Sequence, residues 1–297
     1  MTLNLVLQNI ANGLSLGSLY ALIAIGYTMV YGILRLINFA HGEIFMLAPY
    51  YLYFGMLIFS LPWWASALVA IGLTALTGML SEKIAYKPLR DAPRISALIS
   101  AIGVSFFLQN LSIVVFSGIP KSVHRPSYFT KIFQFGEIRI QSTLFASVGI
   151  SVVFLSLLLF IIYKTKTGLA MRSISYDIET SRLMGIDVNK AISVTFIIGS
   201  ALAAVGGILW SLRFPQIVPT MGTIPGLKAF IAAVVGGIGS VPGAMLGGLL
   251  LGMSEILFVT FFPPISGYRD AFVFLILILI LFFKPDGILG VKTQEKV

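Results

Sequence analysis

Long apolar runs, separated by short polar loops, constrain the fold of this 297-residue chain more than any other feature. A helix that crosses a bilayer needs about 20 predominantly apolar residues, and runs of this order recur along the whole sequence. They predict about eight membrane-spanning helices, with a short partial span at 227–239. The expected spans cover residues 6–31, 42–60, 62–80, 95–117, 142–163, 192–212, 243–262 and 269–283.

Composition supports the same class of protein. Hydrophobic residues make up 58% of the chain and charged residues 10%, with a mean hydropathy of +0.98, whereas about a quarter of the residues of a soluble domain are charged. The polar stretches are too short to bury a core of their own. The sequence therefore predicts an all-α polytopic membrane protein in which residues 1–297 form a single transmembrane domain.

The distribution of Lys and Arg predicts the orientation of the chain. Alternation of the spans places the loops near 81–94 and 164–191 on one side; together with the segment after residue 283, which we assign to the same side, they carry most of the loop Lys and Arg residues. Positive loops favour the cytoplasm, so we expect a cytoplasmic carboxyl terminus and an amino terminus outside. No Lys or Arg precedes the first span, which is therefore expected to stay in the membrane rather than be cleaved as a signal peptide.

The net charge of +9 at pH 7 is spread over separate loops. Dispersed cations at a membrane surface attract anionic lipids, whereas nucleic-acid binding depends on many cations that together neutralise phosphates. We therefore expect membrane lipids, and no nucleic acid, among the partners of this chain.

The longest charged interruption, Lys164 to Lys190, lies between two of the expected spans. Apolar residues recur at every fourth position from 170 to 178, which predicts a short amphipathic helix at the membrane surface. Gly185 is expected to end this helix, and Asp187 or Asn189 to cap the next one. We interpret the segment as a docking surface for a partner outside the membrane; an ordinary solvated loop is the alternative.

A second polar stretch separates the first two expected spans with almost no loop between them. It holds Arg35, Asn38, His41 and Glu43. Ionisable groups at membrane depth are costly and normally face a cavity or a partner, and a break in a helix frees backbone groups that protein or water must satisfy. Asn38, His41, Gly42 and Glu43 are therefore candidates for translocation or gating, with Gly42 expected to permit a bend.

Further ionisable residues at or near membrane depth lie in the second half of the chain. Glu255 is another candidate for the translocation pathway, and Arg269 with Asp270 for structural ion pairing. No metal site is predicted, because the histidine other than His41 is His124, in a loop expected on the opposite side. Cysteine is absent, and the sequence contains neither a catalytic motif nor the phosphate-binding pattern GxxxxGK[ST].

Five motifs spread over nearly the whole chain carry a family resemblance. They are NFAHGE at 38–43, GLSLGSLYALIAIGYTMVYG at 13–32, GLAMRSISYDIETSRLMGI at 168–186, GGIGSVPGAMLGG at 236–248, and YRDAFVFLILILILFFKPDGILG at 268–290. In combination they resemble the permease subunit of bacterial ABC importers for branched-chain amino acids.

In importers of this class, a cytoplasmic loop of the permease docks on an ATPase, and the resemblance places this coupling loop at about 164–191. The ABC permease pattern EAAxxxG aligns with Glu179 and Gly185 at the right spacing, although both alanines of the pattern are replaced. The candidate coupling residues are Arg172, Asp177, Glu179, Arg182 and Gly185.

The resemblance implies a subunit of the cell inner membrane that is not itself an enzyme and binds no cofactor. ATP and Mg²⁺ would bind to two partner ATPase subunits. A second homologous permease subunit and a periplasmic or lipid-anchored solute-binding protein would complete an importer of branched-chain or related amino acids. The residues alone also allow a different class, a self-sufficient secondary carrier or channel for a small polar solute such as urea or an amide.

Overall fold

The computed structural model describes residues 3–90 and 92–290, and helices dominate it. Each of the expected spans corresponds to one long helix with ends that differ by a few residues, which confirms the all-α prediction. These helices are α1 (Leu3–Leu34), α2 (His41–Ile58), α3 (Trp63–Ser81), α4 (Arg94–Phe116), α6 (Ser142–Lys164), α9 (Val188–Arg213), α11 (Val241–Phe261) and α12 (Arg269–Phe283).

Seven helical stretches within the described ranges are long and apolar enough to cross a membrane. The helix α2 is not among them, although its 18 residues match the expected span, because its first turn carries His41 and Glu43. The partial span expected at 227–239 is the helix α10 (Thr223–Gly236). At 1.5 Å per residue α10 is about 21 Å long, shorter than the roughly 30 Å of a bilayer core.

Short elements make up the connections. The helix α3 continues through a π-helical turn, η1 (Glu82–Tyr86), and a 3₁₀ turn, η2 (Lys87–Leu89). The other short helices are α5 (Ser127–Thr130), α7 (Lys166–Tyr176), α8 (Ile178–Leu183) and η3 (Pro263–Tyr268). Two small antiparallel pairs join β1 (Lys121–Ser122) to β4 (Gln216–Ile217), and β2 (Ile132–Phe135) to β3 (Ile138–Gln141).

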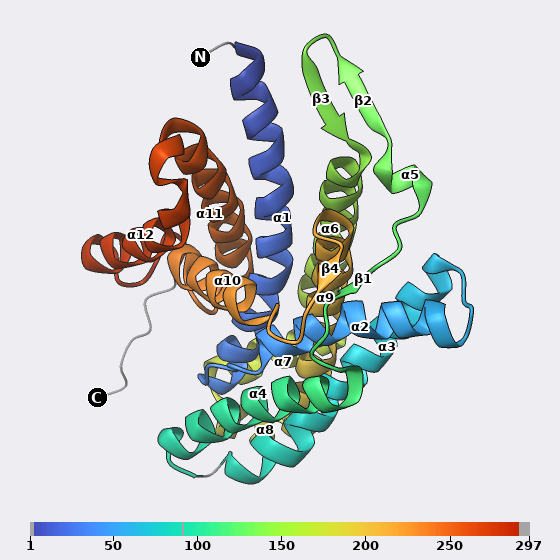
Figure 1. The fold of residues 1–297 in the computed structure, drawn as a ribbon. Helices are drawn as coiled ribbons and strands as arrows, with labels where there is room; N and C mark the ends of the chain where they lie inside the picture. Colours follow the sequence, from blue (N-terminus) through green and yellow to red (C-terminus); the bar gives the residue numbers. More distant parts are fainter. Residues whose placement is uncertain (1–2, 91, 291–297) are drawn as a thin grey trace.

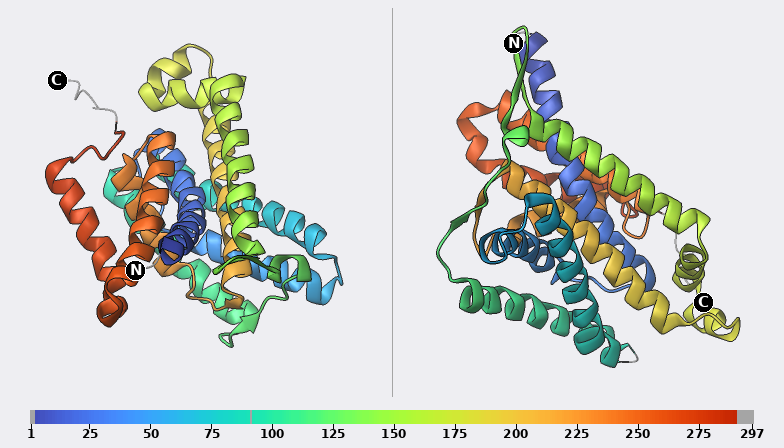
Figure 2. Two further views of the ribbon diagram at one scale, coloured as in Figure 1. Left: turned by 90° about the horizontal axis from the view of Figure 1, so that it is seen from above. Right: turned by 90° about the vertical axis from the view of Figure 1, so that its right-hand side faces the viewer.

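The helix α1 runs through the middle of the bundle and packs most extensively against α11, α9 and α10 (Figure 1; Figure 2). The backbones of α1 and α11 lie unusually close together. A Cβ atom on Gly17 would lie only 2.8 Å from the Cα of Leu249. Gly248 and Gly252 of α11 approach Ala21 and Gly17 in the same way. In lipid, where apolar surface alone gives helices no reason to associate, such close approach is what stabilises a helix pair.

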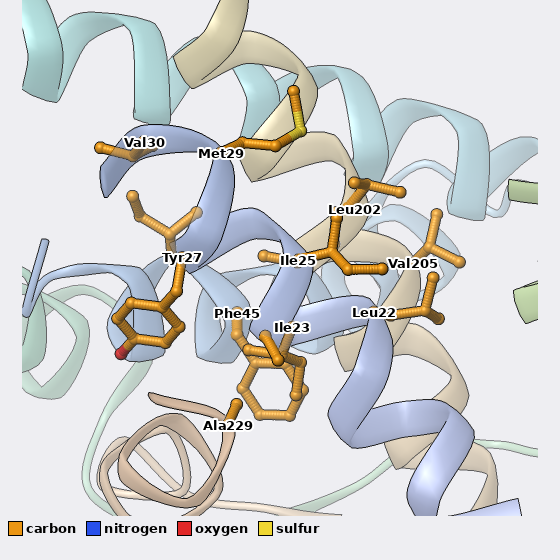
Figure 3. Close-up of a cluster of buried hydrophobic side chains, with 14 of the residues drawn as sticks. Leu22, Ile23, Ile25, Tyr27, Met29, Val30, Phe45, Leu202, Val205 and Ala229 are labelled. Carbon is orange, nitrogen blue, oxygen red and sulfur yellow. The ribbon is translucent and has the colours of Figure 1, made fainter. Parts of the chain in front are cut away.

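The hydrophobic core lies where α1 meets α2, α9 and α10. Figure 3 shows Ile23 of α1, Phe45 of α2 and Ala229 of α10 directed toward one another, with Leu202 and Val205 of α9 on the neighbouring side. All five side chains are buried. This core fixes the start of α2 and the short helix α10 against the central helix.

The break between α1 and α2 lies earlier than the sequence predicts. Arg35 has a positive φ of 54°, which turns the chain directly after α1. Gly42 instead lies inside the first turn of α2 and faces α10, where a Cβ atom on Gly42 would lie 2.8 Å from the carbonyl oxygen of Gly222. The expectation that Gly42 permits the bend is therefore corrected: this glycine allows two helices to touch.

Residues 284–290 fold back onto the end of α10, and we call them the strap. The amide of Ile288 donates to the carbonyl of Val235 at 2.9 Å, and the amide of Leu289 donates to the carbonyl of Gly236 at 2.8 Å. The last carbonyls of a helix lack partners within the helix. The amides of the strap supply the missing hydrogen-bond donors for these carbonyls. The strap also connects the end of α12 to the turn between α10 and α11.

Candidate functional site

The segment expected to couple to an ATPase forms two helices, α7 and α8, where the sequence predicts one. Asp177 separates them and caps α8, because its side chain accepts a hydrogen bond from the amide of Thr180 at 2.9 Å. An aspartate in this capping position stabilises a new helix start. As expected, Gly185 ends the segment with a positive φ of 82°, and Asp187 caps α9 by accepting from the amide of Lys190 at 2.9 Å.

The far end of this helix pair exposes apolar side chains, and we call Tyr176, Leu183 and Met184 the apolar tip. Their exposed fractions are 87%, 87% and 78%. Glu179 and Arg182 are exposed beside them. Sequence reasoning missed the apolar tip, because the predicted apolar periodicity covered only every fourth position from 170 to 178 and gave no sign that these three side chains point outward.

Two arginines connect the helix pair to the bundle. Arg172 of α7 places its guanidinium 5.5 Å from the ring centroid of Tyr163 on α6, a cation–π distance. Arg35 donates to the carbonyl oxygen of Ser175 at 3.3 Å, close to the end of α7. The first contact makes Arg172 a residue that orients α7, and the second joins α7 to the polar stretch between α1 and α2.

The polar stretch itself is buried against neighbouring helices. Asn38 accepts a hydrogen bond from the hydroxyl of Tyr86 at 2.6 Å. The ring of His41 meets that of Tyr27 edge-on with 4.5 Å between centroids. Asn38 and His41 are almost inaccessible. The structure thus gathers these two candidates in the interior, between α1, α2 and η1.

Glu43 extends from the first turn of α2 toward α10. Its Oε1 atom lies 3.5 Å from the hydroxyl of Thr223, which in turn lies 3.3 Å from the side-chain amide nitrogen of Gln109 on α4. Its Oε2 atom has no hydrogen-bond partner within the described ranges. Glu43 is therefore the buried end of a short polar row that continues through the exposed Thr223 to Gln109.

Glu255 lies in a different cluster, which the structure does not bring together with Asn38 to Glu43. Lys228 of α10 forms ion pairs with Glu255 at 2.8 Å and with Asp270 at 2.6 Å. Arg269 lies 3.7 Å from both carboxylates, and the hydroxyl of Tyr20 donates to Glu255 at 2.9 Å. These contacts link α1, α10, α11 and α12 by a charge-balanced network.

Lys228 was not among the candidate residues of the sequence analysis. The signal was present, since Lys228 stands among apolar residues at the edge of the expected partial span. A lysine at membrane depth requires a partner. Because its carboxylates come from residues far away along the chain, the pairing could be recognised only in three dimensions.

A second missed cluster lies next to the coupling helices. Glu82 of η1 is completely buried and pairs with Arg90, and it accepts a hydrogen bond from the hydroxyl of Ser193 at 2.7 Å. Arg90 also donates to the side chain of Asn189 near the start of α9. This asparagine, which the sequence offered as a possible cap, therefore connects α9 to the end of α3.

The polar groups on these helices are arranged for contact and charge pairing. No group of three or more His, Cys, Asp or Glu side chains is placed to hold a metal ion among the residues that the structure describes. The long apolar helices define a multi-pass α-helical membrane protein.

Comparisons with known proteins give the family. Residues 9–281 match the model of the family described as branched-chain amino acid transport system permease component. BraD of Pseudomonas aeruginosa and LivH of Escherichia coli K12, both high-affinity branched-chain amino acid transport system permease proteins, are each 43% identical to this chain. These alignments cover 98% of this chain, with 98% of BraD and 97% of LivH. The chain belongs to the family of branched-chain amino acid transport permeases.

A more distant relative and a solved structure agree with this result. The probable branched-chain amino acid transport permease LivH of Methanocaldococcus jannaschii is 30% identical over 94% of this chain and 90% of its own length. The structure of PsaBC from Streptococcus pneumoniae in complex with Fab matches with a TM-score of 0.50, covering 93% of this chain and 91% of that chain. At 14% identity, the second match concerns the fold alone.

Proposed function

We propose that this chain is a membrane-spanning permease subunit of an ATP-driven importer and forms half of the pathway for branched-chain or related amino acids. The observation that carries the proposal is the helix pair α7 and α8, which extends from one end of the bundle (Figure 2) and exposes the apolar tip. Exposed apolar side chains next to charged ones are typical of a surface that a partner covers. The partner is an ATPase subunit.

In this proposal the apolar tip enters the ATPase surface while Glu179 and Arg182 make charged contacts around it. Asp177 and Gly185 act indirectly, because the first caps α8 and the second allows the chain to leave it. Arg172 orients α7 on α6. A movement of the helix pair reaches the membrane interior through Arg35, which bonds to the end of α7 and is the first residue of the polar stretch.

The partners follow from the same role. A second homologous permease subunit completes the pathway, two ATPase subunits bind ATP and Mg²⁺, and a periplasmic or lipid-anchored solute-binding protein delivers the amino acid. This chain itself binds no cofactor and is no enzyme. It acts as a single permease domain in the cell inner membrane, surrounded by lipids.

The orientation is proposed from the position of the helix pair. If α7 and α8 face a cytoplasmic ATPase, the start of α1, at the opposite end of the bundle (Figure 1), faces outside. The strap lies near the end of α1, since Gly239 beside it approaches Gly32. The carboxyl terminus, which lies outside the described residues, is then cytoplasmic.

Asn38, His41, Gly42 and Glu43 form the gating element in this proposal, because they lie where α2 meets α1 and α10. For Glu255 the surroundings favour structural ion pairing, together with Arg269 and Asp270, since its charge is balanced by Lys228. The pathway surface is therefore mainly apolar.

The experiment that tests coupling replaces Glu179 by Lys and, separately, Gly185 by Val in the reconstituted importer. Both variants should insert into the membrane normally but lose ATP-driven uptake of leucine and co-purify poorly with the ATPase. Lys131→Glu, an equal change of charge between β2 and α5 and far from the helix pair, should keep the ATPase bound.

Two outcomes would contradict the proposal. Normal assembly and uptake by Glu179→Lys and Gly185→Val would remove the docking role of the segment. Uptake by this chain alone in liposomes, without any ATPase, would instead indicate a self-sufficient carrier or channel.

A further inference from the structure

Three buried glutamates can be compared directly in this molecule. Glu82 is paired with Arg90, and Glu255 is paired with Lys228. Glu43 is buried to the same degree, with 3% of its surface exposed. Yet no Lys or Arg lies within ion-pair distance of it among the residues that the structure describes. Because a buried carboxylate normally needs a matching charge, the counter-charge of Glu43 is expected from outside the chain.

The position of Glu43 is fixed by contact between two backbones. The first turns of α2 and α10 touch, since a Cβ atom on Gly42 would lie 2.8 Å from the carbonyl of Gly222 and one on Gly226 would lie 2.7 Å from the Cα of Gly42. No side chain separates the helices here. The carboxylate is consequently held beside Thr223, which is itself exposed at the surface.

The groups around Glu43 are suited to a primary ammonium ion. An ammonium group offers three N–H donors and no acceptor. Glu43 offers a free Oε2 atom, Thr223 a hydroxyl oxygen, and Gln109 a carbonyl oxygen, since its amide nitrogen already donates to Thr223. Divalent cations such as Ca²⁺ take six or more oxygen ligands, usually with several carboxylates, and Glu43 is a single carboxylate.

We propose that Glu43, with Thr223 and Gln109, receives the α-ammonium group of the amino acid as it passes through the permease. This inference rests on the proposed function and assigns a chemical role to one residue of its gating element. The ammonium group is common to all amino acids. Recognition at Glu43 therefore leaves the choice among side chains to the external binding protein.

The test measures binding of radiolabelled leucine to the purified complex of permease and ATPase subunits without the binding protein. Two analogues compete: 3-methylbutylamine has the ammonium group and lacks the carboxylate, and 4-methylpentanoate has the carboxylate and lacks the ammonium group. The amine should displace leucine and the acid should not. In Glu43→Gln, leucine binding should weaken by about tenfold or more, a loss of at least about 1.4 kcal/mol, and the amine should no longer compete.

Asn110→Ala is the matched control, because Asn110 follows Gln109 on α4 but its side-chain amide donates to the carbonyl of Phe106 in its own helix. It should bind leucine like the unaltered complex. If Glu43→Gln fails to assemble, the comparison of amine and acid in the unaltered complex still tests whether the permease recognises the ammonium group.

Equal competition by the acid, unchanged leucine binding in Glu43→Gln, or no leucine binding by the unaltered complex would each overturn the inference. If the complete importer still takes up leucine with ATP, none of these results contradicts the proposed function. Failure of the chain to assemble with an ATPase would refute the proposed function instead.

Discussion

The helices α1 and α12 are both apolar enough to span a membrane, but they occupy opposite environments. Every residue of α1 from 15 to 30 is buried by other helices, whereas Val273 is the one buried residue among those described in α12. The more apolar of the two is the exposed helix α12. The interior helix contains Gly13, Gly17 and Ser18, whereas α12 carries large side chains such as Ile278 and Phe282.

This difference teaches that burial in a membrane protein does not follow apolarity. Lipid tails are as apolar as a leucine side chain, so a large apolar residue gains little by leaving lipid for protein. Close backbone approach and paired polar groups determine which helix is central. Substitutions on the buried and on the exposed helices can separate the contribution of close backbone approach from that of paired polar groups. The first substitution below affects the ion pairs that attach α12 to the bundle.

The largest effect is expected for Lys228→Met, which removes the cation between α10, α11 and α12. Glu255 would keep the hydroxyl of Tyr20 at 2.9 Å and the partly exposed Arg269 at 3.7 Å but would lose its buried cation, and breaking a buried ion pair costs about 3–5 kcal/mol. Thermal unfolding of the purified subunit in detergent measures the loss. Lys228→Met combined with Glu255→Gln should recover most of the stability, because no uncompensated charge remains.

Arg269→Met provides the matched comparison for this cluster. The Arg269 side chain is 58% exposed, so its loss should cost less than about 1 kcal/mol. If Arg269→Met destabilises the subunit as much as Lys228→Met, the attachment of α12 depends on the exposed pair rather than on the buried cation.

Gly17→Leu should come next in size. The new side chain would begin 2.8 Å from the backbone of Leu249, so α1 and α11 would have to separate. Overpacking of this kind costs about 1–3 kcal/mol, measurable as a lower unfolding temperature. Gly103→Leu on α4 should have little effect, because no atom lies within 4 Å of a Cβ placed there. Equal losses for both variants would contradict the comparison.

Tyr86→Phe tests the polar contribution in the interior. It removes the hydroxyl that donates to Asn38, which leaves a buried acceptor without its partner. The expected loss is about 1 kcal/mol in the free energy of unfolding. Tyr176→Phe, which removes an equivalent hydroxyl from an 87% exposed residue, should leave stability unchanged; a similar loss there would argue against a special role for the buried bond.

The smallest expected effect comes from removing one methylene group, either from a side chain buried in the bundle or from a side chain on its surface. Ile23→Val on α1, where the side chain is fully buried, should cost about 1 kcal/mol. Ile278→Val on α12, where the side chain is 63% exposed, should stay within about 0.5 kcal/mol. A reversed order would mean that α12 is covered by protein in the isolated subunit.

The positions of the helices could be predicted from the sequence, and their environment could not. Apolar runs located every long helix, because the bilayer imposes a minimum length on each one. Whether a helix lies in the interior or on the surface of the bundle depends on which other helices it contacts. Hydropathy does not encode these contacts. The close contact of Gly17 with Leu249 joins residues that are far apart in the chain.

The candidate sites show the same limit. The capping role of Asp187 follows from local chemistry and was among the predicted alternatives, while the break at Asp177 was hidden by the apolar residue Ile178, which continues the helical period. The ion pairs of Lys228 could not be predicted, because the carboxylates that pair with it lie on other helices. The roles assigned to Asn38, His41 and Glu43 remain predictions until binding and uptake are measured.

The strap has a consequence for the order of events during synthesis. The carbonyls of Val235 and Gly236 receive their donors from Ile288 and Leu289, so the end of α10 cannot complete its hydrogen bonds while α11 and α12 are still being translated. Domains generally acquire structure from the amino-terminal side as they are made. Here the end of α10 must wait for Ile288 and Leu289, which are made after α12.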